Sequence, residues 1–121
     1  MRLVGVDAPE VARQGNPAEC GGDAATEALR LALAGGSIFL SPDPEQPDRD
    51  RYGRLLRFVA TSSVPTDSAA PWEGSANLWL VRSGAATAYR DLRYGGRASF
   101  FAAEETARAE VSGLWEFCPE A

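Results

Sequence analysis

Apolar and polar residues follow two different periods along this chain of 121 residues, and each period predicts a different kind of element. The short apolar run 3–6 is typical of a β-strand, which Pro9 ends because proline has no N–H for a sheet ladder. Apolar runs at 37–41 and 54–61 predict two further strands. The charged segment 43–51 predicts a turn between them, so we expect an antiparallel hairpin.

Apolar residues at helical spacing predict three α-helices. The first is expected from an Asp23 cap to about Ala34, and the second from a Ser75 cap to Ser83. The third is expected from about Ser99 to Ser112, where apolar residues form one stripe. The segments 11–22 and 62–74 follow neither period and are rich in turn-forming residues, so we expect them to be surface loops.

The composition narrows the chemistry that the chain is able to perform. A chain of this length is expected to form a single domain, residues 1–121. Histidine is absent, which excludes the Ser-His-Asp triad, the Cys-His dyad and most zinc sites. All 12 basic residues are arginine, which favours bidentate recognition of oxyanions. The net charge of -5 argues against a strong nonspecific polyanion binder, but a few arginines in a cleft are still able to engage one phosphate.

The first ten residues contain the strongest candidate for a site. Asp7 and Glu10 follow the predicted strand on a sharp exit at Pro9, and Arg2 stands near the beginning of the strand. Oxygen ligands on a rigid turn suit a hard cation such as calcium, and Arg2 is suited to clamp an anion at the same place. The alternative is a strand end with a solvated acidic turn, and this decapeptide alone does not decide between the two.

The two cysteines, Cys20 and Cys118, lie just outside predicted helices near opposite ends of the chain. They either form a disulfide, which would indicate an oxidising compartment, or remain two reduced thiols. No apolar run is long enough to span a membrane, and no signal peptide is recognised. Because the chain opens directly in a strand, we expect that an upstream segment is missing.

Four ordered segments carry a resemblance to a known family. They are Arg2-Leu-Val-Gly-Val-Asp-Ala-Pro-Glu10, Asp50-Arg-Tyr-Gly-Arg54, Asn77-Leu-Trp-Leu-Val-Arg-Ser-Gly84, and Ala103 to Trp115. With these segments the whole chain resembles the staphylococcal nuclease (thermonuclease) family of calcium-dependent enzymes. The resemblance implies an α+β fold, an OB-type β-barrel with three α-helices. It also implies a nuclease that hydrolyses DNA, and RNA as a second candidate substrate, with low sequence specificity.

The resemblance implies catalytic and metal-binding roles for residues of the first two segments. Arg2 and Arg54 match the two arginines that hold the scissile phosphate, and their guanidinium groups would stabilise charge on the five-coordinate phosphorus. Glu10 matches the general base that aligns or deprotonates water. Asp7 and the backbone carbonyl of Ala8 match calcium ligands, and Glu10 is a further ligand, directly or through water.

Substrate contacts and a disulfide follow from the same resemblance. Arg51 and Tyr52 match residues that contact a terminal phosphate and the nucleotide, and Tyr89 matches a tyrosine beside the nucleotide pocket. The two tyrosines are equally well explained as packing aromatics. The segment directly after Tyr89, Arg-Asp-Leu-Arg, lacks the second tyrosine of the family, which leaves nucleotide preference open. Relatives that look secreted carry cysteines at the positions of Cys20 and Cys118, which implies a disulfide and an extracytoplasmic location.

The sequence departs from the family at its beginning. The first two barrel strands and an Asp-Gly-Asp-Thr type turn with another calcium ligand have no counterpart before Arg2. We therefore expect a barrel that is incomplete at the N-terminus, and self-association that completes the sheet. Two alternatives to the nuclease stay open: a noncatalytic OB-type module that binds nucleic acid or protein, and an inactive fragment of a nuclease.

Overall fold

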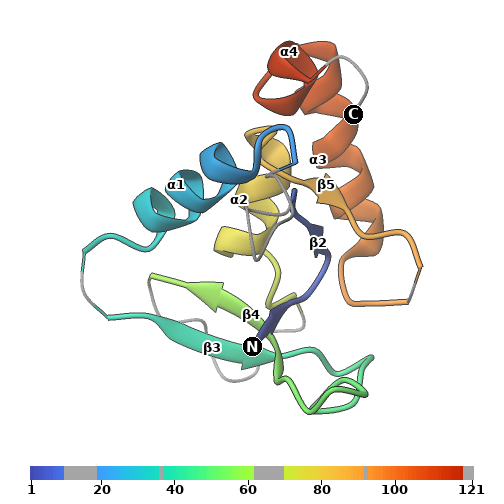
Figure 1. Cartoon of the computed structure of the whole chain (residues 1–121). Helices are drawn as coiled ribbons and strands as arrows, with labels where there is room; N and C mark the ends of the chain where they lie inside the picture. The colour runs from blue at the N-terminus through green and yellow to red at the C-terminus, as the bar shows by residue number, and fades with distance from the viewer. Residues whose placement is uncertain (10–18, 36, 62–69, 92, 119–121) are drawn as a thin grey trace.

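The structure is a computed structural model that describes residues 1–9, 19–35, 37–61, 70–91 and 93–118. It has the expected mixed α+β content (Figure 1). Its elements, in chain order, are β1 (Arg2–Leu3), β2 (Val6–Asp7), α1 (Gly22–Ala32), β3 (Phe39–Pro42), β4 (Leu56–Ala60), α2 (Ala76–Arg82), β5 (Thr87–Ala88), α3 (Arg97–Ala109) and α4 (Leu114–Phe117). In Figure 1 the four helices lie above the sheet formed by β3 and β4.

The described strands form two small sheets. Strands β1, β4 and β3 form one sheet in the order β1-β4-β3, in which β1 runs parallel to β4 and β3 runs antiparallel to it. The predicted hairpin of β3 and β4 is therefore confirmed. Strands β2 and β5 form a separate antiparallel pair. These strands do not close into a barrel within the described residues, and the predicted self-association that would complete the sheet stays a prediction.

The predicted first strand is divided into β1 and β2 by Gly5. This glycine has a φ of 81°, and a Cβ atom at its position would lie 2.7 Å from the ring of Phe100. Only glycine fits a backbone that turns with positive φ directly against this aromatic ring. The break lets β1 pair with β4 while β2 pairs with β5, so one short segment joins both sheets.

The structure contains the three predicted helices near their expected positions and a fourth, short helix, α4. Helix α2 begins after the predicted Ser75 cap, whose hydroxyl oxygen accepts a hydrogen bond from Leu78 N at 3.1 Å. The predicted Asp23 cap is wrong, because α1 begins at Gly22 and its cap position is Gly21. Helix α3 begins at Arg97, two residues earlier than expected, and the short helix α4 was not predicted.

The core lies between the sheet and helices α2 and α3. The rings of Phe58 and Phe100 stack with centroids 6.4 Å apart, and Tyr94 meets Phe100 edge-on at 5.5 Å. Leu114 is buried, and Trp72 of the loop before α2 packs against Phe58. The rest of that predicted loop, residues 62–69, lies outside the described residues. Most of the loop predicted at 11–22 also lies outside them.

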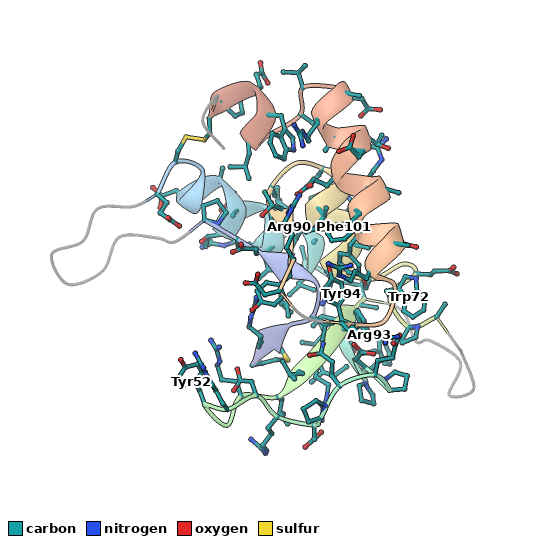
Figure 2. The ribbon with its side chains drawn as sticks, turned by 90° about the vertical axis from the view of Figure 1, so that its right-hand side faces the viewer. Tyr52, Trp72, Arg90, Arg93, Tyr94 and Phe101 are labelled. Atoms are coloured by element: carbon teal, nitrogen blue, oxygen red, sulfur yellow. A yellow bond between two sulfur atoms is a disulfide. The ribbon has the colours of Figure 1, made fainter. Side chains whose placement is uncertain are left out.

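A disulfide joins Cys20 to Cys118, with Cα atoms 6.0 Å apart across a sequence separation of 98 residues. It links the segment before α1 to the residue after α4 and is drawn as the yellow bond in Figure 2. The structure therefore favours the disulfide over two reduced thiols. Among the helices that the structure describes, none is both long and apolar enough to cross a bilayer.

Candidate active site

The parallel pairing of β1 with β4 brings two of the predicted catalytic arginines to one place. Arg2 pairs with Leu56, and Arg2 N donates to the carbonyl oxygen of Leu55 at 2.7 Å. Arg54 directly precedes this pair of leucines, so both arginines reach the same edge of the sheet. Arg2 and Arg54 both line a cleft of about 590 Å³, which is a usual size for a ligand site.

Asp50 orients Arg54 in the turn that follows β3. One Asp50 carboxylate oxygen accepts from Tyr52 N and Arg54 N, both at 2.9 Å, and the other accepts from Arg54 Nε at 2.7 Å. Desolvation acts to raise the pKa of the Asp50 carboxyl, but the hydrogen bonds from Arg54 and Tyr52 together hold that pKa below its usual value. The carboxylate therefore stays ionised, and it holds the guanidinium group by its inner nitrogen.

Tyr52 is the most exposed aromatic side chain of the cleft, 68% exposed, and it lies against two guanidinium groups. The guanidinium carbons of Arg51 and Arg54 lie 4.9 and 5.4 Å from the centre of its ring. Arg51 Nη2 also donates to the Tyr52 hydroxyl oxygen at 2.8 Å. A packing aromatic would be buried, so Tyr52 is not part of the core and its ring contacts only arginine side chains among the ring contacts that the structure describes.

Tyr89 also lines the cleft. The pairing of β2 with β5 ends beside it, where Tyr89 N donates to the carbonyl oxygen of Gly5 at 2.9 Å. The Arg2 guanidinium carbon lies 5.0 Å from the centre of the Tyr89 ring. Tyr89 is partly buried and packs against the core, so its ring both supports the fold and lines the cleft.

Tyr94 was missed in the sequence, although it also lines the cleft. Its hydroxyl donates to the carbonyl oxygen of Tyr89 at 2.6 Å, and burial raises the pKa of Tyr94 to about 12. The sequence reasoning examined only the four residues directly after Tyr89, and Tyr94 stands one position further on. The signal that would have found it is a second tyrosine just before the Gly95-Gly96 pair.

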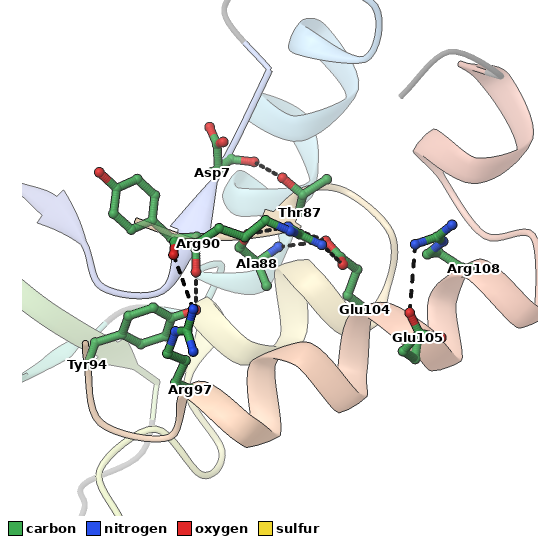
Figure 3. A network of polar contacts seen from close by, with 10 residues as sticks. Asp7, Thr87, Ala88, Arg90, Tyr94, Arg97, Glu104, Glu105 and Arg108 are labelled. Carbon is green, nitrogen blue, oxygen red and sulfur yellow. Dashed lines mark hydrogen bonds and ion pairs between the residues drawn. The ribbon is translucent and has the colours of Figure 1, made fainter. Parts of the chain in front are cut away.

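A buried glutamate fixes strand β5, which directly precedes Tyr89 (Figure 3). Glu104 of α3 is 2% exposed and accepts from Ala88 N at 3.0 Å and from Arg90 Nη1 at 3.1 Å. Its second oxygen forms an ion pair with Arg90 Nη2. The hydrogen bond with Glu104 raises the pKa of Arg90. Glu104 was also missed in the sequence, where it stands beside Ala103 and four residues after Phe100, on the apolar side of the predicted helix.

The predicted metal ligands are only partly described. Asp7 ends β2 with an exposed side chain, and its backbone carbonyl oxygen accepts from Thr87 Oγ1 at 3.2 Å (Figure 3). Ala8 follows it and is exposed, whereas Glu10 lies outside the described residues. Within the described part of the chain, no three His, Cys, Asp or Glu residues come together as a metal site. Asp7 and Ala8 are also not among the described residues that line the cleft.

The structure therefore gathers the predicted arginines and tyrosines in one cleft, whereas Asp7 and Ala8 are not among the described residues that line it, and Glu10 lies outside the described residues. The five predicted residues that line the cleft are Arg2, Arg51, Tyr52, Arg54 and Tyr89. Two more arginines that the sequence reasoning left unassigned, Arg49 and Arg93, line it too. A chain with a net charge of -5 thus places five of its 12 basic residues around one cleft. That concentration of positive charge suits a phosphate ligand.

Comparison with known proteins gives a consistent result. A family model described as staphylococcal nuclease homologue matches residues 1–117. The protein ParB of Escherichia coli is 36% identical over 118 residues, which cover 95% of this chain and 59% of that protein.

Two fungal relatives carry the name probable endonuclease LCL3. The protein of Paracoccidioides lutzii is 32% identical over 125 residues, which cover 96% of this chain and 33% of the relative. The protein of Candida glabrata is 31% identical over 121 residues, which cover 95% of this chain and 42% of the relative. The chain thus spans about a third to three fifths of the length of these relatives.

Proposed function

The chain belongs to the family of staphylococcal nuclease homologues, and from this premise we propose that it hydrolyses phosphodiester bonds in nucleic acid. The observation that carries the proposal is the convergence of Arg2 and Arg54 on one cleft. The relatives named as endonucleases support the same reaction class. DNA is the expected substrate and RNA a second one.

Arg54 would hold the phosphate and stabilise the transition state. Asp50 engages only its Nε atom, and no described residue accepts a hydrogen bond from its two terminal nitrogens. Those nitrogens therefore face a ligand as a preformed fork, which matches two phosphate oxygens. Preorganised donors of this kind stabilise charge that develops in the transition state without reorganisation at the moment of reaction.

Arg2 would act on the same phosphate from the neighbouring strand. Its Nη1 donates to the carbonyl oxygen of Leu3 at 3.1 Å, and no other described residue accepts a hydrogen bond from its guanidinium group, whose remaining N–H groups would bind the ligand. Tyr52 and Tyr89 lie against the arginines and would contact the nucleotide, with Arg51 on an adjacent phosphate. Contacts to phosphates and base faces read no sequence, so low specificity is expected.

Glu10 would act as the general base that aligns or deprotonates the attacking water. We also propose calcium as the cofactor, held by Asp7, the carbonyl oxygen of Ala8 and Glu10. The donors that are described fit this ion, because both are oxygens and no described residue hydrogen-bonds to the Asp7 carboxylate. When bound, calcium would supply positive charge next to a phosphate oxygen.

The experiment that tests the proposal compares cleavage of fluorescent single-stranded DNA in calcium and in EGTA. The wild-type chain is expected to cleave only in calcium, and Glu10→Gln is expected to lose cleavage by about 100-fold or more, the range of general-base catalysis. Arg30→Gln, which removes an exposed arginine paired with Glu27 at 3.7 Å, serves as the matched control. Equal cleavage by wild type and Glu10→Gln would contradict the assignment.

A noncatalytic module that binds nucleic acid is the second candidate, and one observation favours it. The described residues contain the arginine and tyrosine cleft but no cluster of acidic metal ligands. Tight binding of DNA without turnover in calcium, with a steep dependence on salt, would support this candidate.

We propose an extracytoplasmic location for the chain. The disulfide between Cys20 and Cys118 supports it, because such bonds persist in oxidising compartments. Titration of free thiols in protein isolated from its native source tests this location. Two free thiols in the freshly isolated protein would contradict it.

A further inference from the structure

One wall of the cleft is built around a buried carboxylate. Asp43 is 3% exposed, and it accepts from Glu45 N at 3.0 Å and from Gly95 N at 2.9 Å. It thereby joins the turn after β3 to the segment that precedes α3. A Cβ atom on Gly95 would lie 2.8 Å from an Asp43 oxygen, so a glycine is needed for this close approach. The two segments therefore form a fixed wall.

Arg93 stands on this wall, two residues before Gly95, and lines the cleft. Its side chain is 91% exposed, and Arg93 Nη2 lies 3.8 Å from Glu45 Oε1, which is too long for a hydrogen bond. Glu45 is its only ion-pair partner among the residues that the structure describes. An exposed pair of this length contributes little to stability, so the guanidinium group is available to an anion.

Arg93 lies away from the predicted catalytic arginines and their aromatic platform. Figure 2 shows Arg93 and Tyr52 well separated on the two sides of the lower half of the molecule. Both residues nevertheless line the same cleft, together with Arg2 and Arg54. A strand whose scissile phosphate is held by Arg2 and Arg54 therefore lies in a cleft with a further cation, Arg93, away from Tyr52.

We propose that Arg93 forms a second phosphate subsite, which binds a phosphate of the same strand beyond the one held by Arg2 and Arg54. This inference rests on the proposed function. It deepens that function because it makes an oligonucleotide, rather than a single nucleotide, the ligand that fills the cleft. Glu45 competes with the incoming phosphate for Arg93. The hydrogen bonds of Asp43 to Glu45 N and Gly95 N join the two segments of the wall, so the side chain of Arg93 is not needed to join them.

The salt dependence of binding tests this subsite. Binding of a short fluorescent oligothymidylate is measured by anisotropy in EGTA over a range of salt concentrations. Arg93→Gln is expected to weaken binding about three- to tenfold and to lower the slope of log K against log salt by about 0.7, the value for one single-strand phosphate contact. Arg30→Gln is the control, because it removes the same charge from an exposed pair of similar length, 3.7 Å, away from the cleft. Equal slopes in both variants would overturn the subsite.

A second comparison separates a phosphate contact from a general effect of charge. The gain in affinity from a mononucleoside bisphosphate to the oligothymidylate is expected to shrink in Arg93→Gln and to persist in Arg30→Gln. Glu45→Gln removes the competing carboxylate and is expected to tighten oligothymidylate binding about two- to threefold. An unchanged gain in Arg93→Gln would overturn the proposal.

The binding measurements test the subsite and the cleavage assay tests the nuclease, so the two proposals can be contradicted separately. A wild-type chain that cleaves nothing in calcium, but loses salt slope through Arg93→Gln, would contradict the proposed nuclease and support the subsite. A chain that cleaves DNA while Arg93→Gln binds as Arg30→Gln does would support the nuclease and contradict the subsite. A wild-type chain that binds no oligothymidylate would overturn the subsite.

Discussion

The side-chain amide of Asn77 donates to the carbonyl oxygen of Val4 at 2.9 Å, from a fully buried position at the beginning of α2. The same amide nitrogen donates to Arg57 O at 3.1 Å, and the amide oxygen accepts from Val59 N at 2.9 Å. One side chain thus satisfies backbone groups next to β1 and within β4. Those are the two strands whose register brings Arg2 and Arg54 to one cleft.

Replacement of Asn77 by alanine is therefore expected to destabilise the fold strongly. It would leave the buried carbonyl oxygen of Val4 and the buried N–H of Val59 without their partner, whereas Arg57 O keeps its hydrogen bond from Val4 N, and each unpaired group costs roughly 1 to 3 kcal/mol. We expect Asn77→Ala to lower the free energy of unfolding by about 3 kcal/mol, measured by urea denaturation. A loss below about 0.5 kcal/mol, the usual range for surface changes, would contradict this role.

The Asp50 carboxylate is expected to control both activity and acid sensitivity. Asp50→Asn keeps the side-chain shape but weakens the hold on Arg54, so kcat/KM for DNA should fall by about tenfold. Because the pKa of Asp50 is lower in the folded chain than in the unfolded chain, its contribution to stability is present above the unfolded value of 3.8 and is lost as pH falls through the folded value.

Urea midpoints of wild type and Asp50→Asn test the second expectation. The two proteins should differ near neutral pH and converge as the pH falls below about 4, the ordinary range of an aspartate. Kinetics near neutral pH test the first expectation. A gap between the midpoints that grows in acid, or an unchanged kcat/KM, would show that Asp50 does not act in this way.

Glu104 is expected to stabilise the fold and to hold the segment next to Tyr89 in place through its bonds to Ala88 N and Arg90. Glu104→Gln leaves an acceptor for Ala88 N but removes the charge that pairs with Arg90. Loss of one partner of a buried pair costs about 3 to 5 kcal/mol, and because Arg90 is about half exposed we expect about 1 to 3 kcal/mol. Since Glu104 anchors the segment that carries Tyr89, KM for DNA should also rise.

Glu110→Gln is the matched control for Glu104→Gln. Glu110 also pairs with an arginine, Arg82, at 3.0 Å, but both of these side chains are about half exposed. Its replacement is expected to cost at most about 0.5 kcal/mol. Similar losses of stability in the two variants, read from urea denaturation, would show that burial of Glu104 is unimportant.

The disulfide is expected to be a major source of stability. It closes a loop with a sequence separation of 98 residues, and chain-entropy arguments give about 4 to 5 kcal/mol for a loop of that size. The double variant Cys20→Ser/Cys118→Ser should therefore melt at least about 10 °C lower than the oxidised wild type, measured by calorimetry. Equal melting temperatures with and without dithiothreitol would contradict this.

Local signals in the sequence were sufficient to predict helices α1, α2 and α3 and the hairpin of β3 and β4, but not the short helix α4. The Ser75 cap was predictable because its hydroxyl satisfies a nearby backbone N–H. The break at Gly5 was not, because it depends on the ring of Phe100, which is distant in sequence. The Asp23 cap was wrong because the cap position is Gly21, two residues earlier, which has a φ of 86°. Its aspartate instead lies in the first turn, where it favours the helix dipole.

The residues of the candidate site also divide into those that a local segment predicts and those that depend on contacts between distant segments. Arg54 and its turn were predictable from one short segment, because Asp50 and Arg54 lie four residues apart and bind each other directly. Glu104 was not predictable, because only the packing of α3 under β5 brings its carboxylate to Ala88 N. Arg93 likewise becomes part of the cleft through Asp43, which joins two segments distant in sequence.

The joint action of Arg2 and Arg54 on one phosphate is tested most directly by a double-mutant cycle on kcat/KM for single-stranded DNA. Each single change to lysine should lower kcat/KM by about 100- to 1,000-fold, the usual cost of one transition-state donor. The double variant should lose less than the product of the two single losses, since residues that act as a unit are not additive. Single variants that keep wild-type kcat/KM, or two losses that multiply fully, would contradict a shared phosphate.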